Sequence, residues 1–310
     1  MRTTATAIGI DIGGTNLRAG RVSSSGEILD WHAEPIARDP ALVLSRIVAL
    51  CRQLDDATVA GIGIGVPGRV DARTRTVLSG GYLDLAGARL AEQIEQAIEK
   101  PVVIDNDCNM ALVAEMATGA AQGADDVVMF TIGTGIGGAV VLDGKIVRGR
   151  ETAGQLGHIT VRHDGLPCAC GRRGCVETTS SGTALGRLIA EAGLPKGTRA
   201  DTLFERDAAG DVLVGQLLDA WVFPLRAAID SMVAAVDPEL VLLGGGLGSA
   251  ALRALARAPA LSPWYQCPIA AAQLGDDAGV IGGAVSALIE HMIEPEPTGL
   301  VARTLPEARR

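Results

Sequence analysis

The 310-residue sequence lacks the features that mark membrane, secreted and nucleic-acid-binding proteins. No uninterrupted apolar run approaches the roughly twenty residues that a membrane-spanning helix needs. The first residues lead directly into a strand-like segment and leave no room for the apolar core of a secretory signal. Acidic residues (36) outnumber lysine and arginine (27), and the net charge of −9 argues against a nucleic-acid-binding surface. We therefore expect a protein that binds neither membranes nor nucleic acids.

What the composition does contain is typical of a soluble globular protein with a large core. Hydrophobic residues make up 48% of the chain and charged residues 20%. The length suffices for two α/β domains of ordinary size. Six cysteines without a secretory signal fit a reducing compartment, so we expect a cytoplasmic location.

A repeated order of strands and helices divides the chain into two related parts. Each part opens with strands joined by a glycine turn and continues with alternating helices and strands. The first part has predicted strands at 5–12, 17–22, 27–31, 59–66 and 102–104, and predicted helices at 41–54, 84–100 and 108–118. The second has predicted strands at 127–132, 139–142, 145–147, 240–243 and 268–272, and predicted helices at 182–192, 212–236 and 279–292. Two related domains that face each other would place the site in the cleft between them.

A glycine turn follows the first predicted strand of each part. In the first turn, Gly13 and Gly14 let backbone N–H groups approach phosphate oxygens, and Thr15 adds a hydroxyl donor. Asp11 stands at the strand end, where a carboxylate can hold hydrated Mg²⁺. Segment 133–138 repeats the glycine turn in the second part, which suggests a two-sided phosphate clamp. Either turn alone is equally consistent with an ordinary glycine hairpin.

Two familiar nucleotide-binding patterns are excluded at these turns. Neither ends in the Gly-Lys-Ser/Thr that a P-loop requires. Segment 133–138 leads into a predicted hairpin, whereas the Rossmann fingerprint leads into a helix. A third glycine run, 244–246, follows the strand at 240–243. It would let a flat base approach the backbone, or it is a plain turn between a strand and a helix.

Asn106 and Asp107 follow the predicted strand at 102–104 and are the candidate catalytic pair. A carboxylate at the carboxyl end of a strand, facing a cleft, can accept the proton of an attacking hydroxyl. The alternative is a helix N-cap, since Asp and Asn are favoured at that position. Asp105, in the same run, is another candidate for the cap.

A histidine and three cysteines in a Gly/Pro-rich loop form the pattern H-x9-C-x-C-x4-C, at His158, Cys168, Cys170 and Cys175. Three thiolates and an imidazole make a complete tetrahedral set for zinc and leave no open position, so this metal would be structural. A disulfide is the alternative. Two cysteines separated by one residue cannot easily bridge each other, which favours zinc.

With these motifs in view, the sequence resembles the ROK family (repressors, open reading frames, sugar kinases) of the actin-like ATPase superfamily. The resemblance covers nearly the whole chain. It rests on D-I-G-G-T-N at 11–16, V-P-G-R-V-D at 66–71, D-N-D-C-N at 105–109, G-T-G-I-G-G at 133–138, G-Q-L-G-H at 154–158 and C-A-C-G-R-R-G-C-V-E at 168–177.

The resemblance implies an α/β protein with two actin-like, ribonuclease H-like ATPase domains, an interdomain cleft and a structural zinc loop. The smaller N-terminal domain would span 1–118 and be joined by the C-terminal helix 279–292. The larger domain would span 119–278 and carry the zinc loop, 158–177. Relatives are often dimers or tetramers, so we expect a homodimer.

The resemblance also assigns site residues. Asp107 would be the general base on a sugar hydroxyl, normally the 6-hydroxyl, with His158 both ligating zinc and touching the sugar. The other expected sugar-site residues are Gly68, Arg69, Asn106, Gln155 and Glu177. Residues expected to bind ATP with Mg²⁺ are Asp11, Gly13, Gly14, Thr15, Asn16, Thr134, Gly135 and Gly245.

These assignments predict an ATP-dependent kinase that phosphorylates a hexose, with glucose as the expected acceptor. Gln155 is a departure, because the family's usual residue there is a glutamate that binds hydroxyls near C1 and C2. An amide can donate a hydrogen bond as well as accept one, which a carboxylate cannot. We hypothesise that Gln155 weakens binding of plain glucose or suits an acetamido carbonyl. N-acetylmannosamine, N-acetylglucosamine, allose and fructose are therefore alternative acceptors.

Functions outside catalysis are less consistent with the sequence. Repressors of this family carry a winged helix-turn-helix before the first phosphate turn, and here only ten residues precede Asp11. A sugar sensor without catalysis is the stronger non-enzyme alternative, but Asp107 and both glycine turns are present. An actin-like filament protein would not need a sugar-facing zinc loop.

Overall fold

The computed structural model describes residues 5–80 and 83–292, except for the side chains of residues 291 and 292. Its first sheet has five strands in the order β3-β2-β1-β4-β7. These strands are β1 (Thr6–Ile12), β2 (Asn16–Ser23), β3 (Ile28–Pro35), β4 (Val59–Val66) and β7 (Val102–Asn106). Strands β1, β2 and β3 pair antiparallel, whereas β4 and β7 extend the sheet in parallel with β1.

The second sheet repeats this topology in the order β10-β9-β8-β11-β12. Its strands are β8 (Val127–Ile132), β9 (Ile136–Leu142), β10 (Lys145–Ile146), β11 (Leu240–Gly244) and β12 (Ile269–Ala271). Again three strands pair antiparallel and the other two add in parallel to β8. The repeated pattern predicted from the sequence is therefore present as two sheets with the same strand order.

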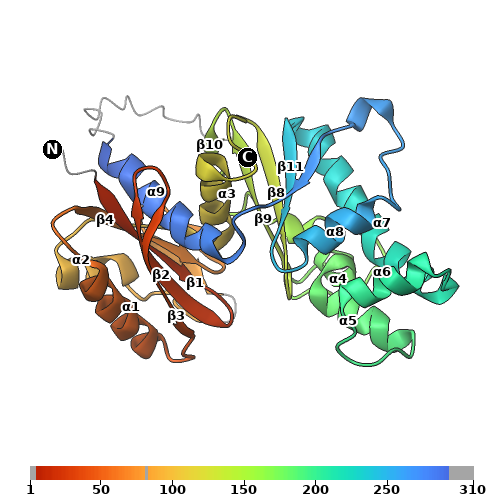
Figure 1. Cartoon of the computed structure of the whole chain (residues 1–310), viewed down its shortest axis with the longest axis horizontal. Coiled ribbons are helices and arrows are strands. Elements are labelled where there is room, and N and C mark those ends of the chain that lie inside the picture. The colour runs from red at the N-terminus through yellow and green to blue at the C-terminus, as the bar shows by residue number, and fades with distance from the viewer. Residues whose placement is uncertain (1–4, 81–82, 293–310) are drawn as a thin grey trace, which may run out of the picture.

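Helices cover both sheets, and one helix contacts elements of each half (Figure 1). Helices α1 (Pro40–Leu54) and α2 (Leu90–Ile98) pack on one face of the first sheet, and α9 (Ala278–Met292) packs against β1 and β4. Helix α3 (Asp107–Thr118) contacts α9 and also β9 of the second sheet. The core of the second sheet includes α5 (Gly182–Glu191), α6 (Ala200–Ala208), α7 (Val212–Val236) and α8 (Gly248–Leu255). The short helix α4 (Glu177–Ser180) contacts α5 and α7.

Glycines allow α9 to lie unusually close to the first sheet. A Cβ on Gly9 would lie 1.7 Å from the carbonyl oxygen of Val280, and a Cβ on Gly63 would lie 1.8 Å from that of Gly283. No side chain fits at such distances, so the sequence G-I-G-I-G in β4 serves close packing between helix and strand. This contact attaches the C-terminal helix to the sheet built from the N-terminal residues.

Helix α7 is long and apolar enough to cross a membrane by length and composition. More than half of its most apolar window, 56%, is buried inside the protein. Trp221, Leu225 and Ile229 belong to the core of the second half, so this helix is a core element. Its N-terminus is capped by Asp211, whose side chain accepts a hydrogen bond from the N–H of Val214.

Some predicted elements differ from the structure. The predicted helix at 84–100 is wrong at its start, because α2 begins only at Leu90 and residues 84–89 form turns around Gly87, whose φ is +74°. The hairpin of β5 (Arg69–Asp71) and β6 (Thr76–Ser79) was not predicted, nor were α6 and α8. Three short 3₁₀ turns complete the described elements, at Leu156–His158, Pro263–Tyr265 and Gly275–Asp277.

Candidate active site and metal cluster

The junction of β7 and α3 holds the candidate catalytic pair. Asn106 is the N-cap of α3: its side-chain oxygen accepts from the N–H groups of Cys108 (2.9 Å) and Asn109 (3.3 Å). Its amide nitrogen donates to the carbonyl of Gly68 (2.8 Å) and to Oδ1 of Asp107 (2.9 Å). Asn106 therefore both caps the helix and orients the carboxylate of Asp107. Asp105 does not cap the helix, so that alternative is wrong.

The carboxyl group of Asp107 has a strongly shifted pKa. Burial first, and then the negative charge of nearby Asp11, raise its pKa from the ordinary 3.8 to about 6. Hydrogen bonds from Cys108 and Asn106 favour the charged form and oppose this shift. A carboxylate with a pKa near neutrality, held by defined donors, is suited to accept a proton from a substrate hydroxyl.

The first glycine turn joins β1 to β2 and brings a carboxylate and a guanidinium together. The N–H of Gly13 donates to the carbonyl of Asn16 (2.9 Å), which closes the turn. Asp11 accepts from Nη1 of Arg18 (3.1 Å), and Nη2 of Arg18 also lies 3.0 Å from Asp276. Burial raises the pKa of Asp11, and Arg18 opposes that rise. Arg18 was missed from the sequence, although the two-residue period of β2 places it on the same face as Asn16.

The second glycine turn joins β8 to β9 and is held by a glutamate from the cysteine loop. Oε2 of Glu177 accepts from the N–H of Ile136 (2.9 Å), and a Cβ on Gly135 would lie 2.5 Å from that oxygen. The carbonyl of Thr134 accepts from the hydroxyl of Thr183 (2.8 Å). Glu177 is thus fixed against the predicted phosphate-binding turn.

The glycine run after β11 approaches the same turn from the other side. Gly245 has a φ of +76°, and a Cβ there would lie 2.6 Å from the carbonyl oxygen of Ile132. The N–H of Leu247 donates to that carbonyl (2.9 Å). The end of β8 and the turn after β11 are therefore in direct backbone contact.

Two cavities contain five of the seven predicted sugar-site residues, and neither is lined by Asp107 or His158. Gly68, Arg69, Asn106 and Gln155 line one narrow cavity of about 10 Å³, together with Asp105, Asn109 and Arg148. Thr134, Gly135 and Glu177 line a second cavity of about 410 Å³ that also reaches Cys168. The residues that line the first cavity come from both halves of the chain: from β5 and the residue before it, from the β7–α3 junction and from the segment after β10. Asp105 and Arg148 were not predicted here, because no local pattern marks an ion pair between such distant residues.

The four predicted metal ligands lie together. The ligand atoms of His158, Cys168, Cys170 and Cys175 are all within 4.8 Å of one another. Nδ1 of His158 is 3.6 Å from Sγ of Cys168, and Sγ of Cys170 is 3.6 Å from Sγ of Cys175. A tetrahedral site with metal–sulfur bonds of about 2.3 Å has sulfur–sulfur separations of about 3.8 Å. All described cysteines are free thiols, so the disulfide alternative is wrong.

Comparison with known proteins identifies the family. The model of the ROK family matches residues 7–290. The chain belongs to the ROK family. A glucokinase of Halalkalibacterium halodurans is 32% identical over 307 residues, which cover 89% of this chain and 93% of that protein. An N-acetylmannosamine kinase of Yersinia pseudotuberculosis is 33% identical over 288 residues, covering 90% and 97% of the two chains.

A solved ROK structure has the same fold over most of the chain. The ROK family glucokinase from Streptomyces griseus, in complex with glucose and AMPPNP, superposes with a TM-score of 0.77 at 31% identity. The match covers 92% of this chain and 100% of that one. The α/β ROK fold expected from the sequence motifs is therefore confirmed.

Proposed function

We propose that this ROK protein is an ATP-dependent hexose kinase and that glucose, at its 6-hydroxyl, is its principal acceptor. The observation that carries the proposal is the β7–α3 junction, where Asn106 holds a carboxyl group, that of Asp107, whose pKa is about 6. Glucokinases and an N-acetylmannosamine kinase at 31–33% identity support the reaction class.

In the proposed reaction, Asp107 accepts the proton of the sugar hydroxyl while the oxygen of that hydroxyl attacks the γ-phosphorus of ATP. The new bond joins the sugar oxygen to phosphorus, and the bond from phosphorus to the β,γ-bridging oxygen breaks, so ADP leaves. Asn106 orients Asp107 through the hydrogen bond between their side chains. Little covalent chemistry falls to the protein, so positioning and charge stabilisation supply most of the rate.

The two glycine turns would hold the phosphates of ATP from opposite sides. Backbone N–H groups of Gly14 and Thr15, both exposed residues, would contact them from the first half, and the Thr15 hydroxyl would add a donor. Thr134 and Gly135 would contact them from the second half. Gly245 would lie beside the base, because its turn contacts the end of β8 next to that loop.

Asp11 fits a Mg²⁺ ion that arrives with ATP. Its carboxylate stands at the end of β1 and is partly buried, next to the first glycine turn. When bound, Mg²⁺ would neutralise charge on the phosphates. Its positive charge beside Asp11 would also remove part of the repulsion that raises the pKa of Asp107.

The Cys₃His cluster fits a structural Zn²⁺ ion. His158, Cys168, Cys170 and Cys175 supply a full tetrahedral set, which leaves no position for substrate on the metal. The metal would fix the loop that begins just after Gln155 and ends at Glu177. It would thereby hold His158 and Glu177 toward the sugar and the second glycine turn.

An amino sugar is the second candidate acceptor, because Gln155 lies in the cavity with Asn106 and Gly68. The amide of Gln155 can donate to an acetamido carbonyl, which the glutamate usual in the family cannot do when ionised. The similarity to N-acetylmannosamine kinase supports this alternative. N-acetylglucosamine, allose and fructose remain further acceptors to test.

The proposed organisation is two domains around a cleft. The first, 1–118 joined by the C-terminal helix, would contain the first sheet, and 119–278 would contain the second. Separate hydrophobic clusters under the two sheets and the contact of α9 with β1 and β4 support this division. We further propose a homodimer in the cytoplasm.

The test is ADP release from MgATP with glucose, mannose, allose, fructose, N-acetylglucosamine and N-acetylmannosamine. Glucose turnover well above the others would establish a glucokinase. Preference for an acetamido sugar would establish the second candidate, and Gln155→Glu should then shift the ranking toward glucose. Sugar binding without turnover of any acceptor would refute the kinase and support a sensor.

A further inference from the structure

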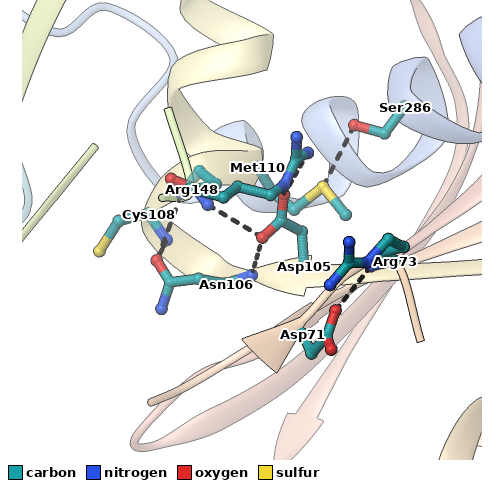
Figure 2. A network of polar contacts seen from close by, with 9 residues as sticks. Asp71, Arg73, Asp105, Asn106, Cys108, Met110, Arg148 and Ser286 are labelled. Atoms are coloured by element: carbon teal, nitrogen blue, oxygen red, sulfur yellow. Dashed lines mark hydrogen bonds and ion pairs between the residues drawn. The ribbon is translucent and has the colours of Figure 1, made fainter. Parts of the chain in front are cut away.

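Two arginines connect the halves of the molecule beside the cavity that contains Gln155. Arg148, after β10, donates from Nε (2.9 Å) and Nη2 (2.6 Å) to Oδ2 of Asp105 in β7. In the opposite direction, Nε of Arg69 in β5 donates to the carbonyl of Glu151 (3.1 Å). Figure 2 shows Arg148 reaching over the β7–α3 junction toward Asp105, with Asn106 beside it.

Asp105 is the centre of this network. Its side chain is 7% exposed, and both of its oxygens accept hydrogen bonds. While Oδ2 receives Arg148, Oδ1 accepts from the amide nitrogen of Asn109 (2.9 Å) and from the N–H of Asn106 (2.7 Å). The carboxylate of Asp105 therefore ties the first turn of α3 and the backbone of Asn106 to a side chain from the other half.

The segment that carries Arg148 is otherwise held by local backbone bonds and by buried Gly154, which packs against β9. It turns through N–H donations from Glu151 (2.9 Å) and Ala153 (3.4 Å) to the carbonyl of Arg148, and Glu151 has a φ of +63°. A non-glycine residue in that region persists only where the surroundings impose it. The bond from Arg69 reaches the carbonyl of Glu151 itself, the ion pair of Arg148 holds the start of the segment, and the segment ends at Gln155.

We infer that Arg148 is a positioning residue: its ion pair with Asp105 holds the 148–155 segment, and with it Gln155, in register with Asn106 and Asp107. The inference rests on the proposed kinase function. Both members of the pair line the cavity that also contains Gly68, Asn106 and Gln155. Arg148 keeps 43% of its side chain exposed, so its main role is to align this site and not to build the core.

The kinetic test compares Arg148→Met with Arg150→Met, an exposed arginine two residues away in the same segment. We expect Arg148→Met to raise the KM for sugar about tenfold or more and to lower kcat, since misplacement by about 1 Å can cost about a hundredfold. The KM for ATP should change less than twofold. Arg148→Lys should restore part of the loss, because it keeps the charge but not the two-nitrogen contact. Equal kinetics for Arg148→Met and Arg150→Met would overturn the inference.

A double-mutant cycle separates positioning from general destabilisation. Asp105→Asn, Arg148→Met and the double variant should raise the sugar KM by similar factors, because each removes the same pair. If the double variant instead lost the product of the two single losses, the residues would act independently. If every change in rate tracked a fall in Tm while the KM for sugar stayed that of the wild type, the ion pair would serve stability alone and the positioning role would be refuted.

A readout independent of turnover distinguishes failure of this inference from failure of the proposed function. Hydrogen exchange of backbone amides 149–155 should accelerate in Arg148→Met and remain at the wild-type rate in Arg150→Met, with no sugar present. If the wild type phosphorylated no sugar but this contrast held, the kinase proposal would be wrong and the positioning role of the Arg148–Asp105 pair would be correct. Unchanged amide exchange in Arg148→Met would refute the positioning role of this pair, whatever the activity of the variant.

Discussion

At the level of single residues, Asp107 is unfavourable for stability in the state that the proposed reaction needs. Its pKa of about 6 means that the folded protein resists the ionised form, through burial and the charge of Asp11. The hydrogen bonds from Asn106 and Cys108 recover only part of that cost. The pKa near neutrality that the proposed base needs thus comes from placing a carboxylate where water cannot solvate it fully.

This residue predicts an acid limit to activity. Because Asp107 must be deprotonated to accept a proton, kcat/KM should fall about tenfold per pH unit below about 6 and level off above it. The measurement is the pH profile of kcat/KM for MgATP, which reports the enzyme before Mg²⁺ reaches Asp11. A profile that stays flat down to pH 5 would remove Asp107 from the role of base.

Asp107→Asn should abolish turnover and yet stabilise the protein at neutral pH. The folded pKa, about 6, exceeds the ordinary 3.8, so ionised Asp107 lowers stability increasingly from pH 3.8 to about 6 and fully above that. Removing the charge should raise the free energy of unfolding at pH 7–8 by up to about 3 kcal/mol, since one pKa unit is worth about 1.4 kcal/mol. The gain should vanish near pH 4, as urea titrations at both pH values would test. Retention of most activity would contradict the proposed role, and sugar binding should survive the substitution.

At the level of elements, the sequence predicted regular segments well and irregular ones poorly. Strands β4 and β8 and helix α7 have the bounds that their apolar patterns predicted. The start of α2 was predicted wrongly, because the helical spacing of apolar residues extends back into residues 84–89. Gly87, in a left-handed conformation, keeps these residues in turns. The cluster of metal ligands was predicted because its members lie close in sequence. The pair of Asp105 and Arg148 depends on how distant segments pack, and no sequence pattern encodes that.

The packing of α9 on the first sheet predicts that Gly63→Ala destabilises the protein, whereas alanine at an uncrowded helical glycine stabilises it. Gly63→Ala would place a methyl group 1.8 Å from the carbonyl oxygen of Gly283, so the helix must move. We expect a loss of about 1–3 kcal/mol or more in the free energy of unfolding. Gly186→Ala, at an exposed position of α5 with no atom within 4 Å of the new Cβ, should stabilise by about 0.5–1 kcal/mol. Denaturant unfolding of both variants tests this, and equal effects would contradict the close contact.

The cysteine loop predicts that metal loss affects stability and sugar binding together. Cys170 is exposed, so a chelator can reach the cluster. Chelation, or Cys170→Ser, should lower Tm and raise the KM for sugar, because His158 and Glu177 lose their support. Cys267→Ala removes a cysteine far from the loop in sequence and should leave the KM unchanged. Wild-type sugar affinity after complete removal of metal would refute the scaffold role.

At the level of the whole molecule, the two turns proposed to bind phosphate belong to different sheets. The first joins β1 to β2 and the second joins β8 to β9. One ATP molecule that contacts both turns must therefore link the halves, and a sugar between Asn106 and Gln155 would add a second link. We expect AMPPNP and the acceptor sugar together to reduce the radius of gyration in solution scattering, more than either alone. Closure of this kind would exclude water as a competing acceptor, so hydrolysis of ATP without sugar should be slow. If scattering stayed unchanged with both ligands bound, the halves would form a fixed site, and exclusion of water would have to come from side chains alone.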